Sequence, residues 1–278
     1  RFPLLAGCGR DTPMLVISVQ SQVVHGHVGN SAAVYPMQAA GVNVAAVPTT
    51  LLSNHPHYPT MRGRVLDAEL VADLLRGVEE RGLVERASVL VTGYLGSPET
   101  AAVVADFARR ATARNPDLIY LCDPVIGDDD LGVFVADGML AAFRDELVPL
   151  ASLVTPNQFE LELLTGAAAR DAAGIVAAAK IVGERGCPRV IATGCTLSDT
   201  APGQVETVLC AGDDLHRIAT PRLPIRPCGT GDLLAGLVAA HLARGLRVEE
   251  ALRRAVDGTF AVLERTQAAA SEEMCLVG

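Results

Sequence analysis

The sequence predicts an α/β protein in which helices cover both faces of a mostly parallel central sheet. Short runs rich in β-branched residues alternate with longer runs of Ala, Leu and Arg that have helical periodicity. The 278 residues contain no long linker rich in Pro, Gly or Ser, and half of them are hydrophobic, which is enough for a sizeable core. We therefore predict a single domain over residues 14–278, preceded by a flexible extension over residues 1–13.

The elements follow one another in strand–helix order until about residue 193. Six β-rich runs predict strands over 14–19, 43–48, 87–92, 118–122, 153–155 and 189–193. The runs between them predict helices over 30–40, 67–80, 98–113, 137–146, 158–164 and 171–184. After that the pattern changes, because the turn-forming linker Ala-Gly-Asp-Asp joins runs 204–210 and 216–220 into an antiparallel hairpin. Two helices, over 230–244 and 248–266, close the chain.

Composition and charge exclude several classes of protein. A formal net charge of −9 and a pI of about 5.1 argue against nucleic-acid binding through clustered basic residues. No run approaches the roughly 18 consecutive apolar residues of a membrane-spanning helix. The only lysine, Lys180, stands in a predicted helix, so a lysine-containing phosphate loop and the strand lysine of protein kinases are both missing. A solvated Lys180 is favoured over a Schiff-base role.

The cysteines predict neither a disulfide framework nor a zinc ribbon. They are seven in number, which is odd, and no two form a CxxC pair. Residues 5–8, Leu-Ala-Gly-Cys, resemble a lipoprotein cleavage site, but the apolar run before them is shorter than that of a signal peptide. We therefore expect a cytoplasmic protein.

Polar residues follow the predicted strands, where a parallel sheet binds its ligands. The clearest motif is Gly229-Thr230-Gly231-Asp232, which leads into an apolar helix. The glycines allow backbone N–H groups to converge at a helix N-terminus and bind an anion, and Asp232 could accept a proton from a substrate hydroxyl. A helix cap formed by Thr230 or Asp232 explains the motif equally well.

Two acidic clusters follow the fourth and fifth predicted strands. Asp123 and Asp128 form one, and Glu160 with Thr155 and Asn157 forms the other. Their hard oxygen atoms suit Mg²⁺ bound together with nucleotide phosphates. The simpler alternatives are a solvated acidic loop around Asp128 and an exposed carboxylate in the first turn of a helix for Glu160. The stretch 25–31, His-Gly-His-Val-Gly-Asn-Ser, lacks the GxGxxG spacing of a dinucleotide site, and its two histidines have no obvious third ligand.

Further segments join these motifs in one characteristic order. They are Val19-Gln20-Ser21, residues 26–33 (Gly-His-Val-Gly-Asn-Ser-Ala-Ala), Ser53-Asn54-His55, residues 93–97 (Gly-Tyr-Leu-Gly-Ser), residues 122–128 (Cys-Asp-Pro-Val-Ile-Gly-Asp) and residues 155–164 (Thr-Pro-Asn-Gln-Phe-Glu-Leu-Glu-Leu-Leu). Together with Gly229–Asp232 they resemble the pyridoxal kinases of the ribokinase superfamily over residues 14–268. The resemblance implies a three-layer ribokinase-like fold.

The resemblance also implies an activity and a set of site residues. The activity is phosphorylation of the 5′-hydroxymethyl group of pyridoxal by ATP with Mg²⁺, and of pyridoxine and pyridoxamine as further substrates, in a homodimeric enzyme. A monovalent cation such as K⁺ is a further candidate cofactor. By position, Asp232 would be the general base and Gly229, Thr230 and Gly231 the anion hole. The implied substrate contacts are Ser21, Val28, Leu52, Pro56, His57, Tyr94 and Asp232. The implied ATP contacts are Asp123, Thr155, Asn157, Glu160, Thr193, Leu223 and Pro227, and the implied metal site contains Asp123, Asp128, Thr155 and Glu160.

Three positions depart from the pattern of the pyridoxal kinases. Leu52 and Pro56 stand where many relatives have Phe and Thr, so the substrate site loses an aromatic wall and a hydroxyl group. Val133 stands where one bacterial subgroup has a cysteine. Two alternatives therefore stay open beside the pyridoxal kinase hypothesis: a hydroxymethylpyrimidine kinase of the same superfamily, and a protein that binds pyridoxal without turnover.

Overall fold

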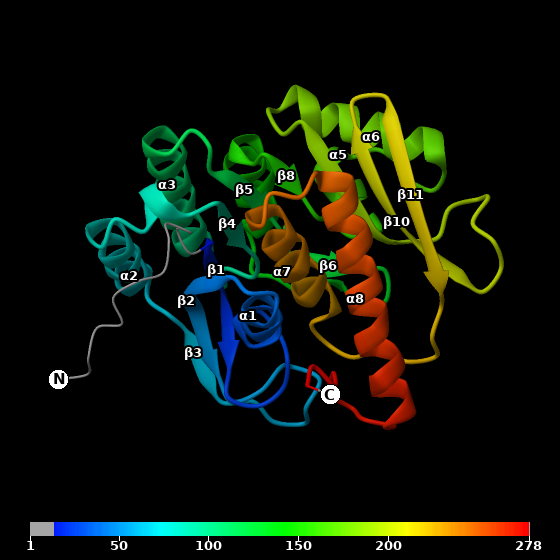
Figure 1. Cartoon of the computed structure of the whole chain (residues 1–278), viewed down its shortest axis with the longest axis horizontal. Coiled ribbons are helices and arrows are strands. Elements are labelled where there is room, and N and C mark those ends of the chain that lie inside the picture. Colours follow the sequence, from blue (N-terminus) through cyan, green and yellow to red (C-terminus); the bar gives the residue numbers. More distant parts are fainter. Residues whose placement is uncertain (1–13, 278) are drawn as a thin grey trace, which may run out of the picture.

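One large sheet runs through the structure, a computed structural model that describes residues 14–277. Its nine strands follow the order β11-β10-β9-β8-β5-β4-β1-β2-β3 (Figure 1). The six central strands are parallel, whereas β10 and β11 at one edge and β3 at the other pair antiparallel with their neighbours. The strand bounds are β1 Leu15–Val23, β2 Asn43–Leu52, β3 Gly63–Val65, β4 Val89–Thr92, β5 Ile119–Cys122, β8 Leu153–Val154, β9 Arg189–Cys195, β10 Gln204–Ala211 and β11 Asp214–Pro221.

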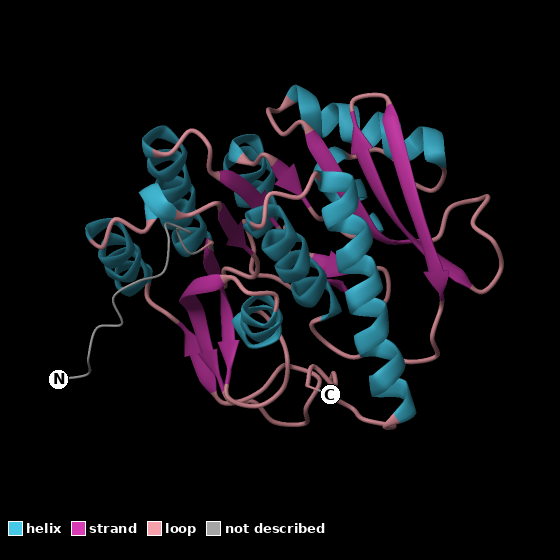
Figure 2. Cartoon of the chain, in the orientation of Figure 1, coloured by secondary structure: helices cyan, strands magenta, loops and turns pink. Residues whose placement is uncertain are grey.

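Helices cover both faces of this sheet and form the outer two of three layers (Figure 2). One layer contains α1, α7 and α8, and the other contains α2 to α6. The alternation of side chains along the strands explains both layers, because Val89 and Val91 of β4 pack toward α7 while Leu90 between them belongs to the opposite core. The helix bounds are α1 Asn30–Ala39, α2 Ala68–Glu80, α3 Pro98–Arg114, α4 Met139–Ala142, α5 Gln158–Thr165, α6 Ala172–Glu184, α7 Thr230–Ala243 and α8 Val248–Ala268.

This architecture confirms the predicted three-layer α/β fold and its late antiparallel hairpin, but several bounds differ. The helix predicted over 137–146 begins at Met139, after Gly138 with a φ of 88°, and continues past Ala142 as a π-helical turn, Phe143–Leu147, and a 3₁₀ turn, Val148–Leu150. Strands β1 and β2 extend beyond the predicted ends at 19 and 48. Several of the added residues are polar but buried, among them Ser21 and Thr50.

Three short strands and one short helical turn were not predicted. Strand β3 has three residues, and the strands β6, Gly127–Asp128, and β7, Gly132–Val133, form a separate two-stranded sheet. A 3₁₀ turn spans Val84–Arg86. Segments of two or three residues are too short to show a hydrophobic period, so their position depends on the partners that they pair with.

The predicted extension and the cleavage-like segment at residues 5–8 lie outside the described residues. Within residues 14–277, no helix combines the length and the apolar character that crossing a membrane requires.

Candidate active site

The Gly229–Asp232 motif lies where α7 begins, as predicted. Gly229 is the N-cap residue, with a φ of 78°, and no side chain caps the helix. The Thr230 hydroxyl instead donates to the carbonyl of Pro227 at 3.1 Å. The helix-cap interpretation of Thr230 and Asp232 is therefore wrong. The backbone N–H groups of the first turn have no partners within the helix and can serve an anion.

Gly229 also marks a close approach of two backbone segments. A Cβ atom at this position would lie 1.8 Å from the carbonyl oxygen of His27. Only glycine combines the left-handed conformation with this contact. The start of α7 is thereby fixed against the segment that follows β1.

Asp232 lies in the first turn of α7 and contacts that same segment. Burial raises the pKa of its carboxyl group to about 6, and a hydrogen bond from the backbone N–H of Gly29 opposes the rise. Gly29 in turn packs against Ser21, because a Cβ at Gly29 would lie 2.3 Å from the Ser21 Oγ atom. Ser21 and Asp232 thus both contact Gly29. An acid with a pKa near 6 can act as a base at neutral pH.

Asp123 follows β5 and, like Glu160, is a buried carboxylate of the predicted metal site. Its Oδ1 atom accepts a hydrogen bond from the Thr155 hydroxyl at 2.8 Å. Burial raises its pKa well above the usual range, the negative charges of Glu160 and Asp232 raise it further, and the Thr155 hydrogen bond opposes them. Three carboxylates therefore influence one another at this edge of the sheet, which is a place where a cation would relieve repulsion.

Glu160 holds backbone in place rather than presenting free oxygens. Its Oε1 accepts from the N–H groups of Ile126 at 2.8 Å and Gly127 at 3.3 Å, and its Oε2 accepts from Asn157 N–H at 2.8 Å. Burial raises its pKa to about 7, against the effect of these three donors. Asn157 completes a capping box for α5 by accepting from the Glu160 N–H, and its side-chain nitrogen donates to the Gly127 carbonyl. Both predicted ligands are occupied by structural hydrogen bonds.

Asp128 has a similar structural task in the β6–β7 hairpin. Its Oδ1 atom accepts from the backbone N–H groups of Asp130 and Leu131, which closes the hairpin turn. The next two acidic residues pair with arginines: Asp129 with Arg170 at 2.9 Å, and Asp130 with Arg226. The hairpin is therefore tied to neighbouring segments by charge.

The other predicted nucleotide contacts come from two neighbouring places. Thr193 lies in β9 beside Asn157, and its N–H donates to the Pro156 carbonyl at 2.9 Å. Leu223 and Pro227 lie in the connection between β11 and α7, next to the paired Arg226. Their contact with ATP stays a prediction.

Three of the predicted substrate contacts come from β2 and the β2–β3 loop, and two others lie after β1 and β4. Leu52 is the last residue of β2, and Pro56 and His57 are exposed in the loop that follows. The partly exposed Val28 lies just before α1. Tyr94 follows β4, where burial raises the pKa of its hydroxyl, and its carbonyl accepts from the Thr49 hydroxyl at 2.7 Å.

Glu273 near the C-terminus is a residue that the sequence did not predict. Its Oε1 atom lies 2.7 Å from His55 Nε2 and accepts from the Tyr58 hydroxyl at 2.8 Å, while its Oε2 accepts from the His27 N–H at 3.1 Å. Burial alone would raise its pKa, but the Tyr58, His55 and His27 interactions lower it overall. No local pattern could have found this residue, because its partners lie more than 200 positions away in the sequence.

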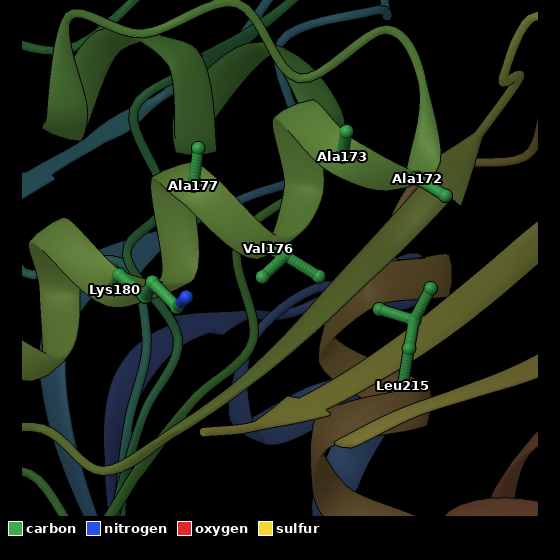
Figure 3. A pocket seen from close by; sticks show the side chains of 6 residues that line it. All are labelled: Ala172, Ala173, Val176, Ala177, Lys180 and Leu215. Atoms are coloured by element: carbon green, nitrogen blue, oxygen red, sulfur yellow. The ribbon is translucent and has the colours of Figure 1, made fainter. Parts of the chain in front are cut away.

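A hollow of about 410 Å³ lies elsewhere, between α6 and β11 (Figure 3). Four of its six lining residues are Ala or Val from α6, and its charged residue, Lys180, pairs with Asp213 at 2.8 Å. None of the predicted site residues lines it. The pairing of Lys180 with an exposed carboxylate agrees with the predicted solvated lysine.

Known proteins agree with this arrangement. A family model described as phosphomethylpyrimidine kinase matches residues 26–274. The pyridoxal kinase PdxY of Granulibacter bethesdensis is 38% identical over 268 residues, with 95% of this chain and 94% of the relative covered. A pyridoxine/pyridoxal/pyridoxamine kinase of Bordetella bronchiseptica is 41% identical, with 96% and 94% covered.

Solved structures give the same result. A pyridoxal kinase from Leishmania donovani, in complex with ADP and ginkgotoxin, superposes with a TM-score of 0.87 at 28% identity, covering 95% of this chain and 93% of that one. The same enzyme with ADP and pyridoxine also gives a TM-score of 0.87, at 27% identity with 95% and 92% covered. The chain therefore belongs to the pyridoxal kinase family, within the ribokinase-like fold.

Proposed function

We propose that this protein transfers the γ-phosphoryl group of ATP to the 5′-hydroxymethyl oxygen of pyridoxal, and that it also accepts pyridoxine and pyridoxamine. The observation that carries this proposal is the position of Asp232, a carboxylate with a pKa of about 6 in the first turn of α7, beside the free N–H groups that follow Gly229. A base next to an anion-binding helix terminus is what phosphoryl transfer to a hydroxyl group needs.

The residues fit a nucleotide-bound Mg²⁺. Asp123 is a buried carboxylate with one oxygen held by Thr155. The other oxygen accepts no hydrogen bond from the described residues, and we propose it as the metal ligand at this edge. Both Glu160 oxygens and the Oδ1 atom of Asp128 accept from backbone N–H groups, so we propose that these two residues act by fixing the surrounding backbone or through water. Bound Mg²⁺ would neutralise charge on the phosphate groups during transfer.

The chain's own groups would perform the remaining steps. Asp232 would take the proton of the substrate's 5′-hydroxyl group. The oxygen of that hydroxyl would form a bond to the γ-phosphorus, while the bond between this phosphorus and the oxygen of the β-phosphate breaks. The N–H groups at residues 229–231 then face the charge that develops on the transferred group. Ser21, which packs against Gly29, would hydrogen-bond the pyridine ring, and Val28 and Tyr94 would form apolar walls beside it.

Phosphorylation of a pyrimidine alcohol is the second candidate. It is favoured by the description of the matching family model, phosphomethylpyrimidine kinase. The loss of an aromatic wall at Leu52 also leaves more room for a different ring. Both candidates use the same base and the same helix terminus, so the difference lies in the contacts of the ring.

A direct assay separates these candidates. Purified protein with ATP and Mg²⁺ would be given pyridoxal, pyridoxine, pyridoxamine and hydroxymethylpyrimidine in separate reactions, and each phosphorylated product quantified by chromatography. We expect the highest kcat/KM for pyridoxal. A preference for the pyrimidine would replace the substrate assignment, and binding of pyridoxal without any product would support a carrier. Reactions with and without K⁺ would test the monovalent cation.

We also propose that the protein is a homodimeric, cytoplasmic, single-domain enzyme over residues 14–278. Exposed apolar side chains of β2 and α2 support a dimer, since Leu51 in β2 is 50% exposed and Leu70 and Leu74 in α2 are 46% and 38% exposed. Light scattering after size exclusion should give twice the chain mass. A Leu74→Glu variant should shift the distribution toward the monomer.

A further inference from the structure

We propose that His55, His57 and Cys228 form a second metal site, suited to a Zn²⁺-class cation and separate from the Mg²⁺ site. One potential ligand atom from each of the three residues lies within 4.8 Å of the other two. The Cys228 Sγ atom lies 3.1 Å from His57 Nδ1. Around a tetrahedral zinc ion, nitrogen and sulfur ligands at their usual bond lengths stand roughly 3.3–3.6 Å apart. Small side-chain rotations would therefore complete the site.

The surroundings of His55 prepare one of its ring nitrogens for a metal. His55 is only 6% exposed, and its Nε2 atom lies 2.7 Å from Glu273 Oε1. The carboxylate can only accept at this contact, so Nε2 carries the proton and Nδ1 keeps a lone pair. Nδ1 is buried and has no hydrogen-bond partner. Buried polar atoms are rarely left in this state, and a bound metal would satisfy it.

Glu273 resembles the outer carboxylates that orient metal-binding histidines. Such a carboxylate fixes the tautomer of the imidazole and makes it a better ligand. Glu273 is itself held by the Tyr58 hydroxyl at 2.8 Å and the His27 N–H at 3.1 Å, so its position does not depend on the metal.

The donor set and the local charge decide which cation fits. Two imidazole nitrogens and a thiolate sulfur favour zinc, whereas Mg²⁺ prefers the oxygen ligands found near Asp123. The negative charges of Glu273, Asp232 and Asp128 all act on the Cys228 thiol, so the region attracts a cation. Three protein ligands leave a fourth tetrahedral position for water.

Such a site would connect two segments that are distant in the sequence. His55 and His57 belong to the loop between β2 and β3, and Cys228 comes directly before the Gly229 N-cap of α7. A bound ion would tie this loop to the start of α7.

Cobalt binding tests the proposal without using catalysis as the readout. Titration of the reduced protein with Co²⁺ in excess Mg²⁺ should produce a thiolate-to-cobalt charge-transfer band that saturates at one equivalent and disappears on addition of Zn²⁺. Cys228→Ser should abolish the band, His57→Ala should weaken binding at least about tenfold, and Glu273→Gln about 10–100-fold. The matched control is Cys275→Ser, because Cys275 is also partly exposed but lies outside the cluster.

A second measurement uses the unmodified protein, so it does not depend on the folding of any variant. Zn²⁺ should slow alkylation of Cys228 by iodoacetamide, followed by peptide mass spectrometry, and should leave alkylation of Cys275 unchanged. The absence of a charge-transfer band, a band that survives in Cys228→Ser, or equal alkylation of Cys228 with and without Zn²⁺ would each overturn the proposal.

Discussion

Replacement of Asp232 by Asn should remove activity and at the same time stabilise the fold. The amide keeps the size of the side chain but cannot take a proton from the substrate hydroxyl. We therefore expect kcat to fall by at least about 10²-fold, the usual contribution of a general base, while the Kd values for pyridoxal and ATP change little. A residue that merely caps the helix would give a different result, because Asn caps a helix about as well as Asp, so that stability and turnover would both change little.

The size of the stability change follows from the pKa of Asp232. Its rise from 3.8 to about 6 corresponds, at 1.36 kcal/mol per unit, to an unfavourable charge burial of about 3 kcal/mol. The carboxylate is partly exposed and Asn loses the charge-assisted contact with the Gly29 N–H, so we expect a net gain of about 1–2 kcal/mol. Because a raised acid pKa lowers stability as pH rises from 3.8 to 6, this gain should be present at pH 7 and disappear below pH 4.

Two measurements on the same preparations check this reasoning. Thermal unfolding at pH 7 should show a melting temperature about 2–8 °C higher for Asp232→Asn. Product formation from pyridoxal gives kcat. Asp73→Asn is the control, because Asp73 is 57% exposed in α2 and pairs with Arg76, so neither quantity should change appreciably. A variant that melts lower and loses binding and turnover equally would show that Asp232 has a structural role only.

Further predictions concern Gly229, the proposed Mg²⁺ site at Asp123 and the pH dependence of catalysis. Gly229→Ala should lower the melting temperature more than Gly245→Ala. Both glycines have φ near 80°, where an alanine costs about 1–3 kcal/mol of backbone strain. The added Cβ would also meet the His27 carbonyl oxygen at Gly229, whereas it would meet no atom within 4 Å at Gly245. Equal losses would mean that the contact can relax. Thr155→Val removes the hydrogen bond to Asp123 and should raise the apparent KM for Mg²⁺ about tenfold. The control Thr155→Ser keeps the hydroxyl group, so its KM should stay near that of the wild type. An unchanged KM in Thr155→Val would place the metal elsewhere. In wild type, kcat/KM for pyridoxal should rise with pH to a plateau above about 6, because Asp232 must be ionised to act as a base; a flat profile between pH 5 and 7 would argue against that role.

The fold was predictable from the sequence because long elements carry their own periodic signal. The sheet was found from runs such as 87–92, and α7 from the apolar stretch after Gly231. The errors occur where local signals are weak or misleading. Polar Gln20 and Ser21 indicated the end of a strand, but both are buried within β1, where the Gln20 side-chain nitrogen donates to the Ser18 hydroxyl at 2.9 Å.

The candidate site was predictable in its membership but not in the use of its atoms. The sequence identified Glu160 and Asp128 as acidic residues at the right edge of the sheet. It could not show that their oxygens accept backbone hydrogen bonds, since that depends on where the chain passes in three dimensions. For Asp232 the sequence left a base and a cap equally open, and the uncapped start of α7 removes the cap, while the role as a base stays a prediction.

Contacts between distant parts of the chain were beyond prediction for a different reason. His57 and Cys228 are separated by 171 positions, and His55 and Glu273 by 218. Metal sites are recognised in a sequence by the short spacing of their ligands, and here the spacing signal covers only the two histidines. The earlier pair, His25 and His27, has the same spacing, yet within residues 14–277 only the pair at 55 and 57 forms a cluster with a cysteine. The difference arises because Gly229 packs against the His27 carbonyl and fixes the start of α7, which places Cys228 beside the β2–β3 loop. The same glycine that shapes the proposed anion-binding turn therefore also positions Cys228 for the proposed second metal site.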